Sequence, residues 1–192
     1  MPVQDPIEAY QRAAEKAAER GIDVAPATLA TADAAGRPSA RTVLIRGVDA
    51  RGFVFYTNFG SRKARELQEN PRAALCQHWQ AIEEQIRVEG RVVVVAPEES
   101  DTYFAGRPRE SQIGAWASEQ SADLASRETL ETRYRDTERR FEGQAVTRPE
   151  FWGGYRVIPD RIEFWYGRPG RLHDRVLYVR SGDQWTVRRL YP

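Results

Sequence analysis

The segment from Tyr56 to Lys63 brings hydroxyl groups and two adjacent cations to a place where a strand is expected to run into a helix. Free backbone N–H groups at the start of a helix bind anions, and the hydroxyl of Ser61 adds to them. Arg62 and Lys63 oppose the helix dipole at this position, so an anionic partner explains them better than an exposed, capped first turn does. The segment therefore predicts a phosphate-binding site without a glycine-rich loop.

A second cationic cluster follows later in the chain. Arg107, Arg109 and Ser111 surround Pro108 where another helix is expected to begin. A surface turn with two incidental arginines would explain the pattern, but the helix start again favours a local anion site. The chain therefore offers two separate positions for negatively charged groups.

Two expected strands carry polar side chains that could contact a ligand. Arg41 and Arg46 flank an apolar stretch, one at each end. Because side chains alternate between the two faces of a strand, an odd-numbered and an even-numbered residue lie on opposite faces unless a β-bulge intervenes. Protection of an edge strand by charge is the alternative explanation. Gln85 lies in another strand, and its amide can pair with the donor and acceptor edge of a flavin or a base.

An aromatic strand and the loop after it complete the candidate groups. The strand Ile162–Tyr166 supplies a flat aromatic wall, and the loop Arg171–Arg175 places His173 between two arginines. The imidazole is a candidate for acid–base or polarising chemistry, whereas a single polar residue in a hairpin is the alternative.

Several familiar catalytic patterns are missing from the sequence. Neither G-x-G-x-x-G nor G-x-x-x-x-G-K occurs, and the chain has no G-x-S-x-G or H-E-x-x-H motif. Cys76 and His78 would project from one strand face, but no third soft ligand lies nearby in the sequence, so we expect no metal site. The single cysteine excludes an intrachain disulfide.

Composition indicates one ordinary globular domain. The chain has 192 residues, of which 41% are hydrophobic and 30% charged, so we expect a single domain over 1–192 with a helix at 1–21 packed on it. The 29 basic and 28 acidic residues nearly cancel, which predicts no general attraction to nucleic acid or to a membrane. The N-terminus lacks the apolar core of a signal peptide, and no apolar run approaches about 20 residues, so a cytoplasmic location is expected by elimination.

The expected elements must position these groups. Asp5 and Pro6 predict the start of the first helix and Gly21 its end. Its apolar stripe is Ile7, Tyr10, Ala14, Ala17 and Ala18. Strands are expected at 27–32, 40–46, 52–57, 73–79 and 85–95, helices at 61–70, 97–104, 112–119 and 122–141, and further strands at 154–158, 161–166, 175–180 and 185–190. Because no βαβ rhythm appears and the strands are short, the pattern predicts an α+β fold with an antiparallel barrel.

From about residue 27 to residue 192, the order and spacing of these segments resemble the pyridoxamine 5′-phosphate oxidase family. The runs that carry the resemblance are Arg107–Trp116, Phe151–Arg156, Arg171–Arg175 and Arg189–Pro192. The resemblance implies an FMN-binding split β-barrel of antiparallel strands with flanking helices, and a homodimer with FMN bound across the subunit interface. It also implies oxidation of pyridoxamine 5′-phosphate or pyridoxine 5′-phosphate to pyridoxal 5′-phosphate, with O2 as electron acceptor and H2O2 as product.

The resemblance also assigns roles by position. The implied FMN contacts are Arg41, Thr42, Val43, Leu44, Ile45, Arg46, Tyr56, Thr57, Arg62, Lys63, Gln85, Gln120, Ser121, Trp165 and Arg175. The implied substrate contacts are Arg46, Tyr103, Arg107, Ser111, Arg171, Leu172 and His173. Among these residues, His173 and Arg175 are expected to hold and polarise the reacting substituent.

Three departures from the family pattern bear on the substrate. Arg46 stands where the family usually has lysine, and Glu84 stands where arginine is common. The sequence also begins close to the first helix, without the basic, tyrosine-bearing segment that precedes it in the family. Two alternatives are a sibling FMN oxidase of a phenazine-type ring and a non-catalytic flavin- or pyridoxal-phosphate-binding protein.

Overall fold

The computed structural model describes residues 5–192, so the expected helix at 1–21 is tested only from Asp5 onward. The helices are α1 (Pro6–Glu19), α2 (Arg62–Glu69), α3 (Pro97–Ala105), α4 (Arg109–Ala117) and α5 (Arg127–Arg140), with short 3₁₀ turns η1 (Gln80–Ile82) and η2 (Pro169–Arg171). The strands are β1 (Pro26–Ala32), β2 (Pro38–Asp49), β3 (Gly52–Asn58), β4 (Arg72–Trp79), β5 (Glu84–Val94), β6 (Trp152–Tyr166), β7 (Asp174–Ser181) and β8 (Gln184–Leu190).

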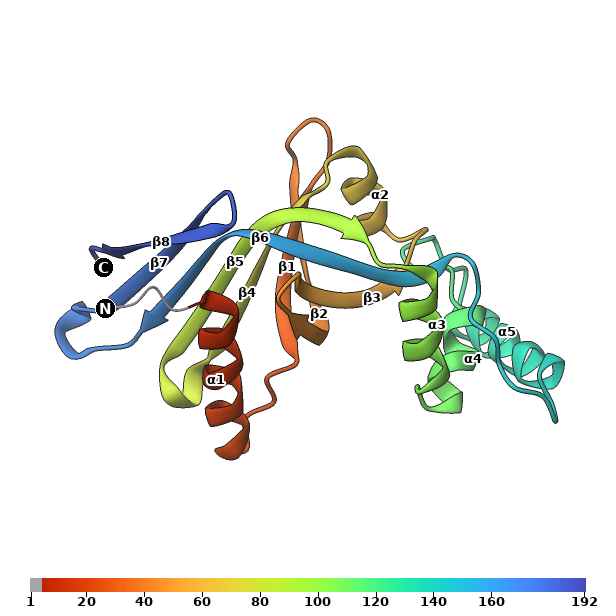
Figure 1. The fold of residues 1–192 in the computed structure, drawn as a ribbon. Helices are drawn as coiled ribbons and strands as arrows, with labels where there is room; N and C mark the ends of the chain where they lie inside the picture. The colour runs from red at the N-terminus through yellow and green to blue at the C-terminus, as the bar shows by residue number, and fades with distance from the viewer. Residues whose placement is uncertain (1–4) are drawn as a thin grey trace.

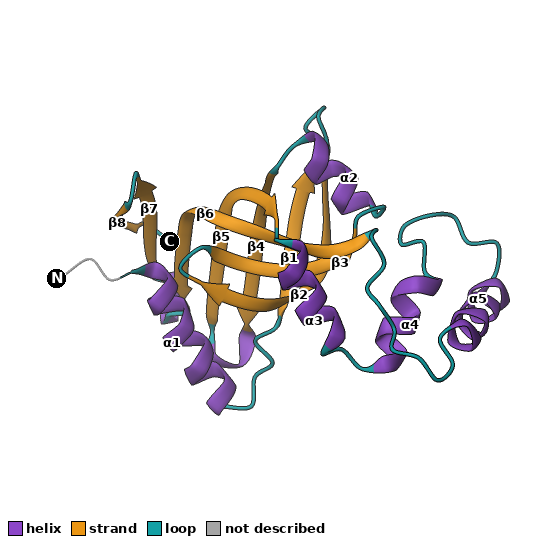
Figure 2. Ribbon diagram, turned by 45° about the vertical axis from the view of Figure 1, so that its right-hand side comes forward, coloured by secondary structure: helices purple, strands orange, loops and turns teal. Residues whose placement is uncertain are grey.

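Six antiparallel strands close into a barrel (Figure 1). The sheet order is β3-β2-β1-β4-β5-β6-β7-β8, and a further pairing between β3 and β6 joins the first six strands into a ring. The remaining two strands extend the sheet from β6 as a hairpin. Figure 2 shows the helices arranged around the barrel rather than between its strands. The expected α+β split barrel with flanking helices is confirmed.

Helix α1 covers the barrel core with one face. The Asp5 carboxylate accepts a hydrogen bond from the backbone N–H of Ile7 at 2.8 Å and so caps the helix, as predicted. Ile7, Tyr10 and Ala17 are buried in the main core, and the Tyr10 hydroxyl donates to Gln77 at 2.8 Å. The prediction was wrong for Ala18, which is exposed because the covered face of this short helix is narrower than the apolar stripe.

Strand β2 contains a β-bulge near its second arginine, Arg46. Its register with β3 shifts between Ile45 and Gly47, so Arg46 is the extra residue of the strand. Val43 and Ile45 are buried in the barrel core. In β3, Val54 is buried along with its neighbours Phe53 and Phe55, so this strand is covered on both faces and shows no alternation of buried and exposed residues.

Several boundaries differ from the prediction. The strands expected at 154–158 and 161–166 form one strand, because β6 pairs with β5 along nearly its whole length. Gly90 permits this pairing, since a Cβ there would lie 2.0 Å from the carbonyl oxygen of Ile158. The helix expected at 112–119 begins earlier, at Arg109, and residues 118–126 form a loop instead of joining the helix expected at 122–141.

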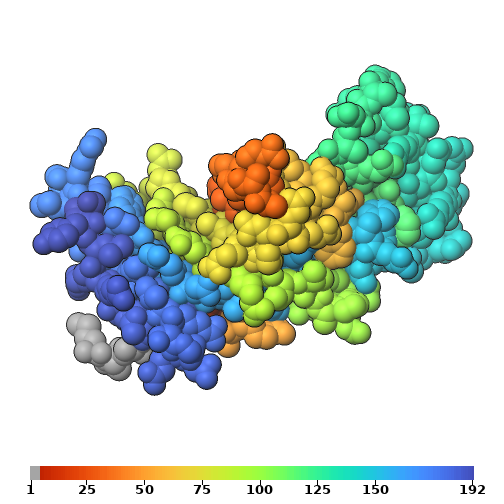
Figure 3. Space-filling model, turned by 90° about the horizontal axis from the view of Figure 1, so that it is seen from above, coloured from red at the N-terminus to blue at the C-terminus, as the bar shows by residue number. Residues whose placement is uncertain are grey.

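Helices α3–α5 form an arm with a small core of its own. Phe104, Ile113, Phe141, Val146 and Trp152 make a cluster separate from the barrel core. Figure 3 shows the arm projecting from one end of the molecule, while the β7–β8 hairpin lies at the other end. Trp152 begins β6, so the arm is anchored where this long strand leaves the barrel.

Candidate functional site

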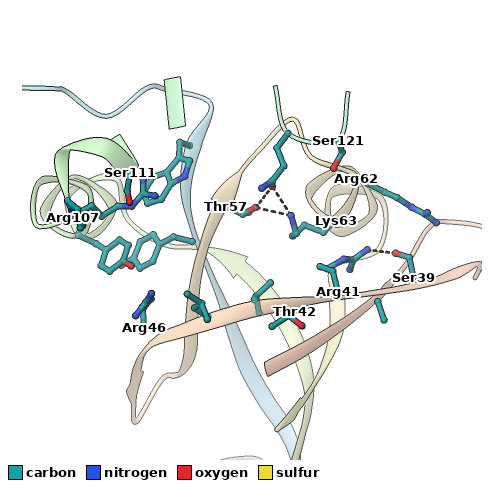
Figure 4. Close-up of a pocket in the computed structure, with 18 residues that line it drawn as sticks. Ser39, Arg41, Thr42, Arg46, Thr57, Arg62, Lys63, Arg107, Ser111 and Ser121 are labelled. Atoms are coloured by element: carbon teal, nitrogen blue, oxygen red, sulfur yellow. Dashed lines mark hydrogen bonds between the residues drawn. The ribbon is translucent and has the colours of Figure 1, made fainter. Parts of the chain in front are cut away.

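A cleft of about 830 Å³ lies between the barrel and the arm (Figure 4). This volume lies within the range of small-molecule and cofactor sites. From the expected FMN contacts, the cleft brings together Arg41, Thr42, Val43, Leu44, Arg46, Tyr56, Thr57, Arg62, Lys63, Gln120 and Ser121. From the expected substrate contacts, it adds Tyr103, Arg107 and Ser111. Arg41 and Arg46 line the same cleft despite their parity, and so do Thr42, Val43 and Leu44 between them, so both faces of this part of β2 border it.

Lys63 is the buried cation at one side of the cleft. Its Nζ donates to Gln120 at 2.8 Å, to Thr57 at 3.1 Å and to Ser61 at 3.3 Å. Ser61 is the N-cap residue of α2, but its side chain makes no capping hydrogen bond, because its buried hydroxyl accepts from Lys63. Burial, with a smaller effect from the charge of Arg41, lowers the pKa of Lys63 to about 8 despite the opposing charge of Glu66.

Two arginines, Arg41 and Arg62, lie on the same side of the cleft as Lys63 and share one buried carboxylate. Glu66 accepts hydrogen bonds from Arg62 Nε at 2.8 Å and from Arg41 Nη2 at 3.2 Å. Arg41 also donates to the hydroxyls of Thr31 and Ser39. Three cationic side chains, Arg41, Arg62 and Lys63, thus lie together on the α2 side of the cleft (Figure 4).

Arg107 lies on the opposite, α4 side of the cleft (Figure 4). Its guanidinium packs over the ring of Trp152 at 4.7 Å and over that of Phe104 at 5.5 Å. Its Nη1 is buried, and no hydrogen-bond partner for it exists among residues 5–192. Burial lowers the pKa of Arg107, the nearby Tyr103 opposes that shift, and the charge of Arg46 adds to it. A buried donor without a partner is costly, so this position fits an anionic group from a ligand.

Parallel aromatic rings form a wall of the cleft. The rings of Tyr56 and Tyr103 stack with centroids 3.9 Å apart and an angle of 7° between their planes. Trp152 is parallel to both rings, at 5.5 Å from Tyr56 and 6.2 Å from Tyr103. This wall holds Tyr103 and Arg107 in one rigid group, which suits recognition of a ligand at a fixed position.

The other expected site residues lie outside this cleft. Ile45 is buried in the barrel core. Gln85, Trp165, Arg171, Leu172, His173 and Arg175 are in β5, β6, η2, β7 and the loop before β7. Figure 1 shows β7 at the end of the molecule opposite α4 and α5. One chain therefore does not bring His173 and Arg175 to the cleft that contains Arg107 and Lys63.

The expected site residues outside the cleft form a second group with contacts of their own. Arg175 forms a two-point ion pair with the buried Glu163, with Nε–Oε1 at 2.8 Å and Nη2–Oε2 at 3.0 Å. The rings of Trp165 and His173 lie 4.5 Å apart, and Gln85 pairs in register with Trp165. Leu172 is 74% exposed.

Sequence reasoning missed some of the residues that shape these two groups. Ser39, Pro108 and Trp152 also line the cleft, although Trp152 was part of a run that carried the family resemblance. Glu66 and Glu163 were not singled out. The spacing of Arg62 and Glu66 by four residues in a helix was the available signal for the first of them.

Neither a metal site nor a membrane-spanning helix is seen in the described chain. Within residues 5–192, no group of three or more His, Cys, Asp or Glu side chains is placed to hold a metal ion. The helices of this range are also too short or too polar to cross a membrane.

Comparison with known proteins covers nearly the whole chain. Residues 14–140 match the family described as "Pyridoxamine 5'-phosphate oxidase", and residues 152–192 match the "Pyridoxine 5'-phosphate oxidase C-terminal dimerisation region". A "Pyridoxine/pyridoxamine 5'-phosphate oxidase" of Anaeromyxobacter dehalogenans is 57% identical over 98% of this chain and 96% of its own length. The protein of the same name from Rubrobacter xylanophilus is 58% identical over 98% of this chain and 87% of its own length.

Solved structures agree with this placement. PhzG from Burkholderia lata 383, crystallised with tetrahydrophenazine-1-carboxylic acid, has a TM-score of 0.94 and 33% identity over 100% of this chain and 94% of that chain. An FMN-binding protein of Nostoc punctiforme has a TM-score of 0.78 with 18% identity over 98% of this chain and 99% of that chain, and so shares its fold. Since two family matches span both the barrel and the C-terminal strands, and since close relatives share more than half of its residues, this chain belongs to the pyridoxine/pyridoxamine 5′-phosphate oxidase family of oxidoreductases.

Proposed function

We propose that this protein is an FMN-dependent oxidase that converts pyridoxamine 5′-phosphate or pyridoxine 5′-phosphate to pyridoxal 5′-phosphate, with O2 as electron acceptor and H2O2 as product. The observation that carries the proposal is the presence of two separate cationic groups on opposite sides of one cleft. One group is centred on Lys63 and the other on Arg107. Two such groups suit two phosphates, one from a cofactor and one from a substrate.

The residues on the α2 side fit the phosphate of FMN. Lys63, Arg41 and Arg62 supply positive charge beside the N-terminus of α2, where backbone N–H groups also favour an anion. The cleft volume of about 830 Å³ leaves room for a ring system beyond the phosphate. FMN, when bound, supplies the hydride acceptor and the route of electrons to O2.

The residues on the α4 side would bind the substrate. Arg107 donates from its buried Nη1 to the substrate phosphate, and the hydroxyls of Tyr103 and Ser111 add neutral hydrogen bonds. Arg46 adds a second guanidinium at the cleft. These contacts orient the pyridine ring without taking part in bond breaking. The reacting carbon would lose a hydride to the flavin, and its hydroxyl or amino group would lose a proton. The alcohol gives the aldehyde directly, whereas the amine gives an imine, which water hydrolyses to the aldehyde and ammonia.

A second copy of the chain would complete the site. Residues 152–192, which match a dimerisation region, contain Trp165, His173 and Arg175. None of these three side chains lines the cleft of its own chain, so we propose that they serve the cleft of the partner. His173 and Arg175 would then hold the amine or alcohol at the reacting carbon, with Glu163 fixing the guanidinium of Arg175.

This arrangement predicts an obligatory dimer. Sedimentation at micromolar concentration should show a species of twice the 21.9 kDa chain mass, in both the flavin-free and flavin-loaded protein. Because one chain lacks part of the site, the flavin-loaded protein should not be active as a monomer. An active, flavin-loaded monomer would refute the shared site.

Turnover in air tests the reaction itself. Pyridoxamine 5′-phosphate and pyridoxine 5′-phosphate should each yield pyridoxal 5′-phosphate and an equivalent of H2O2, and each should bleach the flavin when oxygen is excluded. Bleaching by an unphosphorylated tricyclic ring but by neither phosphate ester would identify a sibling oxidase. Tight flavin binding with no bleaching and no peroxide would identify a non-catalytic binding protein.

A further inference from the structure

Glu66 is a buried carboxylate, and glutamate is rarely buried in proteins. It lies on α2, beside the three cations of the cleft, and its side chain is only 7% exposed. A buried charge is tolerated only when ion pairs and hydrogen bonds replace the water it has lost. The surroundings of Glu66 therefore show what its charge is used for.

Both oxygens of Glu66 accept hydrogen bonds, from β1, from β2 and from the first residue of α2 itself. Oε2 accepts from Thr31 at 2.5 Å, from Ser39 at 2.6 Å and from Arg41 at 3.2 Å, and Oε1 accepts from Arg62 at 2.8 Å. Burial by itself raises the pKa of this carboxyl, but the four hydrogen bonds outweigh burial and lower the pKa to about 2. The carboxylate is therefore ionised at neutral pH.

These contacts restrict two long side chains. Arg62 is 61% exposed and would sample many rotamers without an anchor. Its Nε is held by Glu66, which leaves its two Nη groups to serve another acceptor. Arg41 is held by the same carboxylate, so one residue sets the spacing of two guanidinium groups at the cleft.

We infer that Glu66 is a positioning residue for phosphate recognition: its carboxylate holds Arg41 and Arg62 in the arrangement that binds the phosphate of FMN. The inference rests on the proposed FMN site and deepens it. Glu66 does not contact the phosphate, since like charges repel; it acts through the two arginines. Because the two arginine side chains are oriented before FMN binds, less side-chain conformational entropy is lost on binding.

Because Glu66 is negatively charged, the direction in which its removal changes FMN affinity distinguishes two explanations. A carboxylate close to a phosphate site lowers the local positive potential, so on charge alone its removal should strengthen FMN binding. Loss of positioning should weaken FMN binding instead. The two explanations therefore predict opposite changes for the substitution Glu66→Gln.

The test compares FMN with riboflavin, which lacks the phosphate, by quenching of flavin fluorescence in the flavin-free dimer. Glu66→Gln should raise the Kd of FMN at least tenfold and change the Kd of riboflavin less than twofold. Glu69→Gln is the matched control, because Glu69 is exposed on the same helix and its carboxylate accepts only from the backbone N–H of Ala34 among the described residues. It should leave both Kd values unchanged.

A second pair of variants separates positioning from loss of fold. In the Arg62→Ala background, Glu66→Gln should lose a large part of its effect, because one of the side chains it orients is gone. If Glu66→Gln does not fold, Glu66→Asp replaces it, since aspartate keeps the charge but is too short to reach both arginines, and the same FMN-selective loss is expected.

The outcomes are distinguishable. Unchanged or tighter FMN binding in the folded Glu66 variant, or equal weakening of FMN and riboflavin, would overturn the inference and leave the proposed function standing. Wild-type protein that binds FMN no better than riboflavin would overturn the proposed phosphate site and the inference together.

Discussion

Substitution of Arg107 by alanine should lower kcat/KM for pyridoxamine 5′-phosphate by about 100-fold and change kcat/KM for unphosphorylated pyridoxamine much less. Within residues 5–192 the buried Nη1 of Arg107 has no hydrogen-bond partner, and the residue lies beside Tyr103. A hydrogen bond to a charged group contributes about 1.5–3 kcal/mol, and a guanidinium can make two with one phosphate. The wild-type enzyme should accordingly prefer the phosphorylated substrate by at least about 100-fold, and the variant should lose most of that preference.

Arg109→Ala is the control for this substitution. Arg109 lies in the same turn, but its guanidinium donates to the carbonyl oxygens of Gln144 at 2.9 Å and Phe141 at 2.6 Å, away from the cleft. It should leave the preference for phosphate intact even if it lowers the melting temperature. Steady-state kinetics with both substrates supplies the comparison, and equal activity of the wild type on both would move this protein towards the sibling-oxidase alternative.

The double substitution Arg62→Ala/Lys63→Ala should weaken FMN binding by at least tenfold, and by about 100-fold if each lost contact contributes about 1.5 kcal/mol. Both residues line the cleft, and Lys63 is nearly buried with its charge facing polar groups. Fluorescence titration of flavin-free protein measures the change. Arg65→Ala is the control, because Arg65 is exposed on the same helix and donates to the carbonyl oxygen of Gly60. Undiminished FMN affinity in the double variant would place the phosphate elsewhere.

The pKa of Lys63 gives this site a pH dependence with a definite sign. In the flavin-free protein, burial lowers this pKa to about 8, so Lys63 loses its proton as pH rises through that value. A phosphate stabilises the protonated form, so FMN affinity should be highest below pH 8 and fall above it, by up to about tenfold per pH unit. Lys63→Arg stays charged and should show a flatter profile over the same range.

Much of the proposed phosphate-binding site could be predicted from the sequence, because its cations are neighbours along the chain. Cations in the first turn of a helix oppose its dipole over a single turn, so Arg62 and Lys63 stand out wherever α2 lies in the fold. The start of α4 was predicted less accurately, since the helix expected from residue 112 begins at Arg109, directly after Pro108. The antiparallel pattern also followed from short apolar runs between turns, and the closed barrel is consistent with it.

The partners of these residues were decided by tertiary structure. The sequence places Glu66 four residues after Arg62, but only the packing of α2 against β1 and β2 brings Thr31 and Arg41 to the same carboxylate. The bulge at Arg46 depends on the register between β2 and β3, which no local propensity sets.

The sequence by itself determined the family, the antiparallel α+β fold and the residues that are cationic at helix starts, since these depend on residue types and their order. Only the tertiary structure decided which of those residues share a cleft. Barrel closure brings β2, α2 and α4 around one cavity, and it leaves His173 and Arg175 at the start of β7, beside the C-terminal end of β6 and outside that cavity. The reason is geometric: strands and helices hold nearby residues at set spacings, whereas distances between elements are set by how the sheet closes and how the arm packs on it.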